Sequence, residues 1–259
     1  MKLTMYQIDA FADRRFEGNP AAVCLLPHWL DDEIMQAIAQ ENNLSETAFV
    51  VESKRGYEIR WFTPAREVDL CGHATLASAH VVFNSLNRGV EEVVFQSRSG
   101  PLKVGRDGDL LEMDFPAQPP QPCALPAAVR NAFDEAPSHC LRGDDFIVVF
   151  DSENAIASAR PDLQEIQKLP LRGLAITAKS EAYDFVMRFF APRFGIDEDP
   201  VTGSAFTQLI PYWSGVLGKR SMVARQVSSR GGDVRCEMQG DRVKMAGRAA
   251  TYFEGKIRI

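Results

Sequence analysis

The sequence predicts an α+β protein of two similar lobes, because one arrangement of elements occurs twice along the chain. A helix headed by Cys71-Gly72-His73 comes after a strand that ends at Phe62 and is followed by Thr63-Pro64. A second helix, headed by Thr202-Gly203-Ser204, comes after a strand that ends at Phe190 and is followed by Ala191-Pro192. Two copies are too few for a solenoid, so a duplicated lobe is the natural interpretation.

A predicted β-hairpin follows each of these helices. The first covers 100–113 and the second 233–245, each with a glycine in its turn. Between the two copies, the segment 116–122 contains four prolines in seven residues, PAQPPQP. Neither a helix nor a central strand tolerates that density of proline. We therefore expect an N-terminal lobe at 1–117 and a C-terminal lobe at 118–259.

The first lobe should open with two strands, at 6–11 and 21–26, joined by a turn at Gly18-Asn19-Pro20. Asp31 is expected to cap a helix that packs on the sheet. Glu46 then lies where a polar loop runs into a strand rich in β-branched and aromatic residues. From the residues alone, Glu46 is best interpreted as a solvated glutamate at a strand edge.

The second lobe should alternate short helices and strands before its glycine-headed helix. Proline does not fit the interior of a helix, so Pro211 is expected to kink or restart that helix. The chain should end in strands. Helices are expected at 126–133 and 162–168, and strands at 145–150, 173–178, 185–190, 252–253 and 257–259.

Composition narrows the possible partners and the compartment. Of 259 residues, 45% are hydrophobic and 25% charged, and the formal net charge is −6. This balance is typical of a globular protein with a core and argues against a nucleic-acid partner, but it leaves room for a small anionic metabolite. Five cysteines without a CxxC pair favour a reducing compartment over a disulfide framework or zinc cluster. With no signal core and no long apolar run, we expect a cytoplasmic protein without membrane contact.

The two helix starts are the candidate binding positions. Free N–H groups and the positive end of the helix dipole favour an anion there. If both starts face a cleft between the lobes, a carboxylic acid, an imidazole and a second carboxylate meet, which suits proton transfer. The candidate residues are Glu46, Cys71, His73, Asp199, Thr202 and Ser204. Cys71 and His73 are not expected to form a thiol dyad, because neighbours two apart at a helix start seldom face each other in hydrogen-bond geometry.

Other enzyme classes lack their motifs. The sequence contains no GxGxxG, GxxxxGK[ST], HExxH or GxSxG pattern, so nucleotide-binding, zinc-protease and α/β-hydrolase assignments have no support. The four histidines are scattered, and no metal site is predicted.

Several ordered motifs resemble the phenazine-biosynthesis F-protein (PhzF) family over nearly the whole chain. They are Phe16-Glu17-Gly18-Asn19-Pro20-Ala21-Ala22-Val23, Asn43-Leu44-Ser45-Glu46-Thr47-Ala48-Phe49, Cys71-Gly72-His73-Ala74-Thr75 and Asp199-Pro200-Val201-Thr202-Gly203-Ser204-Ala205. The resemblance implies the diaminopimelate-epimerase-like fold, in which two pseudo-symmetric lobes each wrap a mixed or antiparallel sheet around a central helix. It also implies an active site between the lobes, a usual homodimer and no cofactor.

Residue by residue, the resemblance makes Glu46 the acid and base that moves a proton on a small carboxylate-bearing substrate. His73 and Asp199 would assist the transfer, and Gly72 and Gly203 would offer backbone amides. The remaining substrate-binding candidates are Thr202, Ser204 and Cys71. To serve as acid and base near neutral pH, Glu46 would have to be held partly protonated, which burial against apolar groups can achieve.

Two departures from related sequences keep other functions open. Related epimerases place a catalytic thiol in each lobe, whereas this chain keeps Cys71 and has Pro200 near the second position. Many relatives have His-Cys after Gly-Ser-Ala, where this chain has Phe206-Thr207, so the substrate is expected to differ. The alternatives are a racemase or epimerase of an amino or hydroxy acid, and a non-catalytic metabolite-binding protein on the same scaffold.

Overall fold

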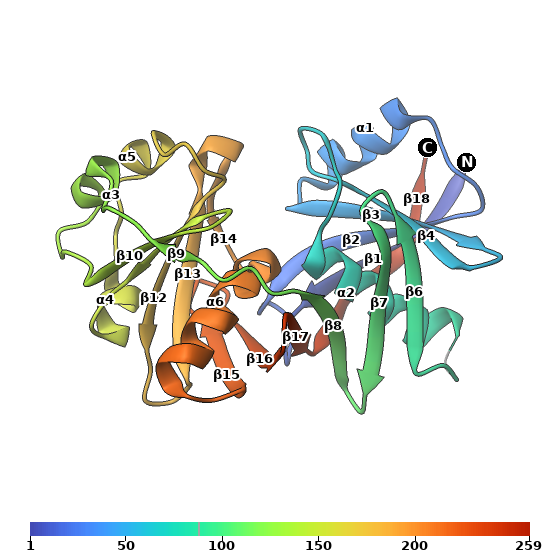
Figure 1. The fold of residues 1–259 in the computed structure, drawn as a ribbon. Coiled ribbons are helices and arrows are strands. Elements are labelled where there is room, and N and C mark those ends of the chain that lie inside the picture. The colour runs from blue at the N-terminus through green and yellow to red at the C-terminus, as the bar shows by residue number, and fades with distance from the viewer. Residues whose placement is uncertain (88) are drawn as a thin grey trace. The chain divides into compact units, whose positions relative to one another are not determined.

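The protein forms two compact units, one of residues 1–114 with 246–259 and one of residues 115–245 (Figure 1). The structure is a computed structural model and describes residues 1–87 and 89–259. Each unit combines a mixed β-sheet with a few helices, so the predicted α+β class is confirmed. None of the helices in the described ranges has the length and hydrophobicity that crossing a bilayer requires.

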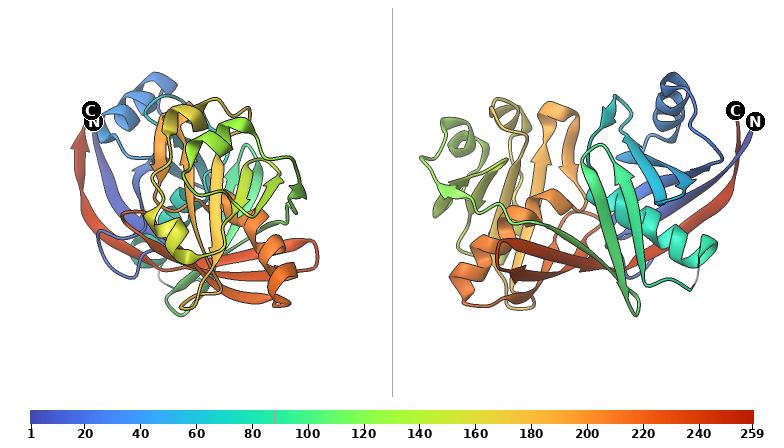
Figure 2. Two further views of the ribbon diagram at one scale, coloured as in Figure 1. Left: turned by 90° about the vertical axis from the view of Figure 1, so that its left-hand side faces the viewer. Right: turned by 45° about the vertical axis from the view of Figure 1, so that its right-hand side comes forward.

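The C-terminal strand belongs to the first unit, which differs from the expected division at residue 117. β18 (Ala249–Arg258) pairs antiparallel with β1 (Lys2–Ala10) along the whole of that strand. The two chain ends therefore lie side by side in both views of Figure 2, and Ile259 N–H donates to the carbonyl of Met1 at 2.9 Å. A strand forms its hydrogen bonds with whichever strand lies beside it in space, even if that strand is distant in the sequence. The C-terminal segment 246–259 therefore belongs to the same unit as the N-terminal strand.

The first unit wraps its strands around one helix. α2 (Gly72–Val81) is buried on nearly every side and contacts β1, β2, β3, β7 and β18. Its small residues allow this close approach of sheet and helix. α1 (Asp32–Asn42) packs on β3 and β4, and a π-helical turn, Val82–Leu86, follows α2. The remaining strands are β2 (Asn19–Leu26), β3 (Glu46–Ser53), β4 (Gly56–Phe62), β5 (Glu67–Val68), β6 (Glu92–Ser97), β7 (Gly100–Asp107) and β8 (Leu110–Pro116).

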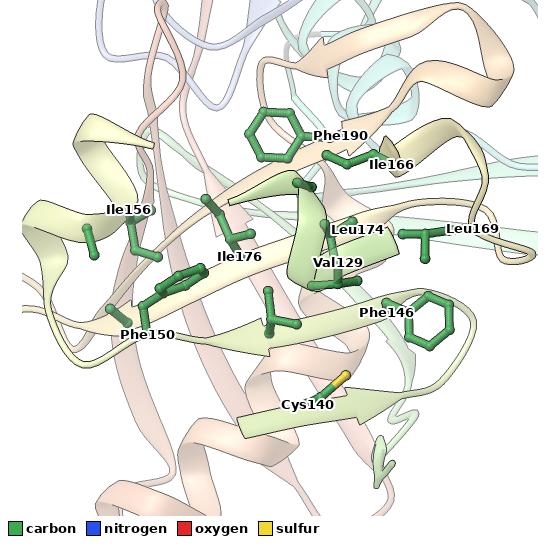
Figure 3. Close-up of a cluster of buried hydrophobic side chains, with 14 of the residues drawn as sticks. Val129, Cys140, Phe146, Phe150, Ile156, Ile166, Leu169, Leu174, Ile176 and Phe190 are labelled. Atoms are coloured by element: carbon green, nitrogen blue, oxygen red, sulfur yellow. The ribbon is translucent and has the colours of Figure 1, made fainter. Parts of the chain in front are cut away.

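The second unit has a central sheet with short helices on one face and one long helix on the other. α3 (Ala127–Ala132), α4 (Glu153–Ser158) and α5 (Leu163–Gln167) cover the first face, where Figure 3 shows their side chains packed over Leu174 and Ile176. α6 (Gly203–Leu217) covers the other face, and its Trp213 ring stacks on Phe185. The strands are β9 (Gln121–Pro122), β10 (His139–Arg142), β11 (Phe146–Val149), β12 (Leu174–Lys179), β13 (Phe185–Ala191), β14 (Ile196–Asp199), β15 (Ser221–Gln226), β16 (Gly232–Gln239) and β17 (Arg242–Gly247).

The helix α6 continues through Pro211, so the expected restart does not occur. Proline has no N–H to offer the carbonyl of Thr207 one turn earlier. Gln118 supplies the missing donor, because its backbone N–H binds that carbonyl at 2.9 Å and its side chain accepts from the Thr207 hydroxyl at 2.8 Å. Because Pro211 leaves the Thr207 carbonyl free, that carbonyl can bind Gln118. The segment that enters the second unit is in this way hydrogen-bonded to α6.

The duplication seen in the sequence is repeated in side-chain contacts. In the first unit the guanidinium of Arg60 binds both carboxylate oxygens of Glu67, at 2.6 and 2.7 Å. In the second, Arg188 binds both oxygens of Glu198, at 2.7 and 2.9 Å. Each guanidinium also lies over the ring of the phenylalanine two residues further along its own strand. Such matched bidentate pairs fix equivalent positions in the two units.

Candidate active site

The first group of candidate residues is built on the start of α2. Cys71 is the N-cap residue, with an extended backbone (φ −145°, ψ 109°), and Gly72 opens the helix. Thr75 holds this turn by donating to the Cys71 carbonyl from both its N–H (3.1 Å) and its hydroxyl (2.6 Å). The N–H groups of Gly72 and His73 have no acceptor within the helix, as in any first turn, and they are suited to an anion.

Glu46 reaches this helix start from the sheet. It is the first residue of β3 and pairs with Ala21 of the parallel strand β2. Its Oε2 lies 3.2 Å from Nε2 of His73, and the two side chains are 14% and 7% exposed. The interpretation of Glu46 as a solvated edge residue is therefore wrong. The parallel pairing with β2 carries the start of β3 beneath α2, and sequence spacing does not reveal that placement.

His73 is a neutral imidazole, because burial lowers its pKa to about 3. Its approach to Glu46 is consequently a contact between a carboxyl and an uncharged ring and not an ion pair. The 3.2 Å separation is not aligned as a hydrogen bond, since buried Nε2 has no hydrogen-bond partner among the described residues. Catalytic hydrogen bonds are often loose without substrate and tighten in the complex.

Cys71 and His73 do face each other, contrary to the expectation from their spacing. Sγ of Cys71 lies 3.6 Å from Nδ1 of His73, within the range of a sulfur hydrogen bond. The expectation holds for two residues inside a helix. Cys71 is an N-cap with an extended backbone, so its side chain turns back over the first helical turn.

The second group of candidates lies at the start of α6. Asp199 ends β14, and Thr202 is the N-cap residue before Gly203. The Thr202 hydroxyl donates to Oδ2 of Asp199 at 2.5 Å. Ser204 occupies the first turn, and its carbonyl accepts from the Thr207 hydroxyl at 2.7 Å.

Gln226 organises this second group and was not predicted from the sequence. It is fully buried at the end of β15. Its Oε1 accepts from the Thr202 N–H at 2.8 Å, while its Nε2 donates to the Asp199 carbonyl at 2.6 Å. One side chain thus fixes the turn between β14 and α6. The only signal in the sequence is an amide at the end of an apolar strand, which does not identify its partner.

The repeated architecture shows which residues of the two groups correspond. Val68 is paired with β4 in the first unit as Asp199 is paired with β13 in the second. The helices α2 and α6 begin at the same offset after these residues. Thr202 is therefore the counterpart of Cys71, and it follows Pro200 by two residues. The second unit has a hydroxyl where the first has a thiol.

The first group also offers three different ligand atoms at one point. A carboxylate oxygen of Glu46, the Cys71 sulfur and a His73 ring nitrogen all lie within 4.8 Å of one another. Within residues 1–87 and 89–259 no other group of three such side chains is this close. Oxygen, sulfur and nitrogen together suit Zn²⁺ among the common ions, provided that the thiol is deprotonated.

The chain matches known proteins over its full length. The family model described as phenazine biosynthesis-like protein matches residues 8–255. An uncharacterized isomerase of Pseudomonas aeruginosa is 52% identical over 259 residues, with 100% of both chains covered. The crystal structure of a PhzF-family phenazine biosynthesis protein from Enterococcus faecalis superposes with a TM-score of 0.98 at 42% identity, again covering 100% of both chains.

The same fold occurs in more distant enzymes. A hydroxyproline epimerase from Agrobacterium vitis, solved with bound trans-4-hydroxy-L-proline, superposes with a TM-score of 0.65 at 12% identity, covering 99% of this chain and 92% of the other. This likeness confirms the predicted epimerase-like fold. With the full-length relatives it leads to one conclusion: the chain is an isomerase and belongs to the phenazine biosynthesis-like (PhzF) family.

Proposed function

We propose that this isomerase moves one proton on a small carboxylate-bearing metabolite without a cofactor, with Glu46 as both base and acid. The observation that supports this proposal best is the pairing of a largely buried carboxyl with a neutral imidazole, 3.2 Å apart. A neutral ring adds no positive charge of its own beside the carboxylate, so His73 does not weaken Glu46 as a base.

The proposed reaction needs no redox step. The Glu46 carboxylate takes a proton from one carbon of the substrate, and the electron pair left behind is delocalised into an adjoining double bond or carbonyl. The protonated Glu46 then returns the proton to a second carbon, so the double bond moves and the composition is unchanged. His73 would orient the carboxyl through Nε2 in both steps.

Substrate binding is assigned to the helix starts. The N–H groups of Gly72 and His73 suit the substrate carboxylate, because an anion is stabilised at a helix N-terminus. By family resemblance the same role extends to Gly203 and Ser204, with Asp199 and Thr202 supplying polar contacts. A homodimer and a cytoplasmic location stay predictions from the sequence.

Deuterium incorporation tests the proposal across many compounds at once, because the label marks whichever carbon exchanges its proton. The full-length protein is incubated in heavy water with a panel of unsaturated and cyclic carboxylates, and mass spectrometry with NMR locates the label. We expect label at ring or alkene carbons. Glu46→Gln should lower the incorporation rate by about 10²–10⁴-fold, the usual share of a general base.

A matched control is available on the same strand. Glu52 lies on β3 but is exposed to solvent, so Glu52→Gln should incorporate label at the wild-type rate. Equal thermal unfolding of both variants would show that the loss at position 46 is chemical. Unchanged incorporation by Glu46→Gln would remove Glu46 from the mechanism.

The thiol beside His73 favours a second candidate function, a one-thiol epimerase of an amino or hydroxy acid. In that reaction Cys71 would supply or remove the proton on one face of the α-carbon. The position of the label separates the two functions, because an epimerase labels the α-carbon and an isomerase labels ring or alkene positions. A binding protein without catalysis labels neither.

A further inference from the structure

The last strand of the chain forms one edge of the sheet in the first unit. The strands of that unit follow one another in the order β18, β1, β2, β3 and β4. The left view of Figure 2 shows β18 (red) outside β1 (dark blue). Within residues 1–87 and 89–259, no second strand runs alongside β18. Such an edge presents unpaired backbone N–H and C=O groups to a further strand.

The hydrogen bonds at the two chain ends fix which backbone groups face this free edge. The Ile259 N–H donates to the Met1 carbonyl at 2.9 Å, and the Met1 amino group donates to the Ile259 carbonyl. Hydrogen-bonded pairs alternate along an antiparallel ladder, so every second residue from Ile259 back along β18 points its backbone groups at β1. The backbone groups of Glu254, Lys256 and Arg258 therefore point away from β1.

The open part of the edge begins after Thr251. Nε of Arg15 donates to the Thr251 carbonyl at 3.0 Å, so that carbonyl already has a partner. Beyond it, Tyr252, Phe253 and Ile259 are large apolar residues whose side chains are exposed. Exposed apolar side chains along an open strand edge are typical of an interaction surface.

We propose that β18 pairs antiparallel with β18 of a second copy of this chain, about a two-fold axis through Gly255. In this register Glu254 lies opposite Lys256 of the partner subunit, and Tyr252 lies opposite Arg258 of the partner subunit. A homodimer is expected from the family resemblance, and the edge of β18 gives it an interface and a register. This pairing does not depend on the role proposed for Glu46.

The charges on the free edge select this register. Backbone groups that point outward must lie opposite one another, so the candidate registers are centred on Glu254, Gly255 or Lys256. Opposite charges stabilise an antiparallel pair when they face each other directly, and like charges destabilise it. Centring on Glu254 would bring two glutamates together, and centring on Lys256 would bring two lysines together. Centring on Gly255 instead forms two Glu254–Lys256 pairs in each dimer.

Gly255 suits the centre of the pair, where the two backbones come closest. It would face its own copy in a non-hydrogen-bonded pair, in which the Cα atoms are about 4.5 Å apart. The ring of Phe253 lies over Gly255, in the space that a side chain at position 255 would occupy. Each ring would also lie opposite Ile257 of the partner subunit, so the pair buries apolar surface that the single chain exposes.

Charge reversal tests the register in solution. Sedimentation velocity of the full-length protein over a series of concentrations should show a dimer. Glu254→Lys brings like charges face to face twice in each dimer and should raise the dissociation constant by about tenfold. Lys256→Glu should have the same effect. Combining Glu254→Lys with Lys256→Glu restores opposite signs and should restore the wild-type dissociation constant.

A matched control lies two strands further into the sheet. Glu52 is exposed on β3, which β1 and β2 separate from β18. Glu52→Lys changes the net charge by the same amount as Glu254→Lys and should leave the dissociation constant unchanged. Equal thermal unfolding of the two variants would show that the weaker association does not arise from a damaged fold.

Cysteine cross-linking tests which residues face each other. Phe253→Cys and Ile257→Cys, mixed and treated with oxidised glutathione, should form a disulfide between subunits, because these positions are directly opposite. Phe253→Cys alone should not cross-link to itself, since its two copies would lie about 14 Å apart along the strands. A protein that stays monomeric, a dimer that neither charge reversal weakens, or self-linking of Phe253→Cys would overturn the proposal. If Ile257→Cys fails to fold, the charge reversals still decide.

Discussion

The hydroxyl of Thr202 lies 2.5 Å from the carboxylate of Asp199, and the two residues flank the turn that leads from β14 into α6. A substitution that removes the hydroxyl but keeps the shape of the side chain measures how much this hydrogen bond contributes to stability. We expect Thr202→Val to lower the free energy of unfolding by about 1.5–3 kcal/mol, the range for hydrogen bonds to charged groups. Urea titration measures the change, and Thr202→Ser, which keeps the hydroxyl, should retain most of the stability. Equal stability of the valine and wild-type proteins would contradict this role.

Two histidines should make the fold less stable as the pH falls. Burial lowers the pKa of His73 to about 3 and that of His80 to about 4. The unfolded chain binds these protons from about pH 6.5 downward, whereas the folded chain does not. Stability from each neutral ring is therefore complete above pH 6.5 and declines below it, down to about pH 4 for His80 and about pH 3 for His73.

The size of this pH effect is measurable at His80 without disturbing the candidate site. At pH 5.5 each ring should account for about 1.4 kcal/mol of lost stability relative to pH 7.5. His80→Gln can keep the contact with the Thr251 hydroxyl, 2.9 Å away in the native protein, but it cannot bind a proton. Denaturant unfolding at the two pH values should show a smaller loss in this variant by about that amount. An equal loss of stability in both proteins would contradict a half-buried His80 that stays neutral.

The buried carboxylate of Asp145 should be one of the most sensitive positions of the second unit. It has no exposed surface and binds the Arg172 guanidinium, while Gln208 of α6 donates to it at 2.8 Å. Removing the carboxylate leaves the Arg172 guanidinium without this partner, but that side chain is 40% exposed and stays partly hydrated, so the expected cost is about 1.5–3 kcal/mol, the range for hydrogen bonds to charged groups. We expect Asp145→Asn to lose about that much stability in urea. Asp144→Asn changes an exposed neighbour and should behave as wild type.

The sequence predicted those features that depend on local patterns. The helix starts at Gly72 and Gly203 follow from glycine and small residues after a polar turn, and the duplication follows from comparing two stretches of the same chain. Long-range pairing was not accessible in this way. The partners of Gln226 and the return of β18 to β1 depend on which segments meet after folding. Neither a glutamine nor an alternating strand pattern in the sequence reveals which residues it will contact in the fold.

The contact between Cys71 and His73 escaped prediction for a different reason. Spacing rules assume helical dihedral angles, and Cys71 is the extended residue immediately before the helix. The side chain of such an N-cap residue takes a direction set by its extended backbone and not by helical spacing. The sequence identified both residues as candidates and could not identify their mutual orientation.

A soft divalent cation should occupy the same three side chains and block proton transfer. The ligand atoms of Glu46, Cys71 and His73 lie within 4.8 Å of one another, and small side-chain shifts would bring them to zinc-binding distances. We expect Zn²⁺ to inhibit deuterium incorporation and Mg²⁺ to have no effect, because Mg²⁺ prefers oxygen ligands alone. Co²⁺ should give a thiolate-to-cobalt absorption band that is absent in Cys71→Ser. No band in the unmodified protein would show that these residues bind no such ion.

A second pair of thiols should form a disulfide when an oxidant is supplied. Cys123 and Cys140 have their sulfur atoms 3.4 Å apart, and the Cys123 N–H donates to the Cys140 carbonyl at 3.0 Å. The two residues are therefore cross-strand neighbours, so closing the S–S bond requires side-chain rotation and little backbone movement. Cys123 is the more exposed of the two thiols. Burial, and after it the hydrogen bond and charge of the neighbouring Cys123, raise the pKa of Cys140 to about 12. Cys123 should react first.

With oxidised glutathione as the oxidant, the thiolate of Cys123 attacks one glutathione sulfur and releases one reduced glutathione. The Cys140 thiolate then attacks the Cys123 sulfur and releases the second. Mass spectrometry should show the loss of two hydrogens and one peptide pair linking Cys123 to Cys140, with roughly 3 kcal/mol of added stability for a loop of this length. Cys140→Ser should stop at the mixed disulfide with glutathione, and Cys123→Ser should remain reduced. A disulfide that involves Cys24 or Cys236 instead would contradict the arrangement of these strands.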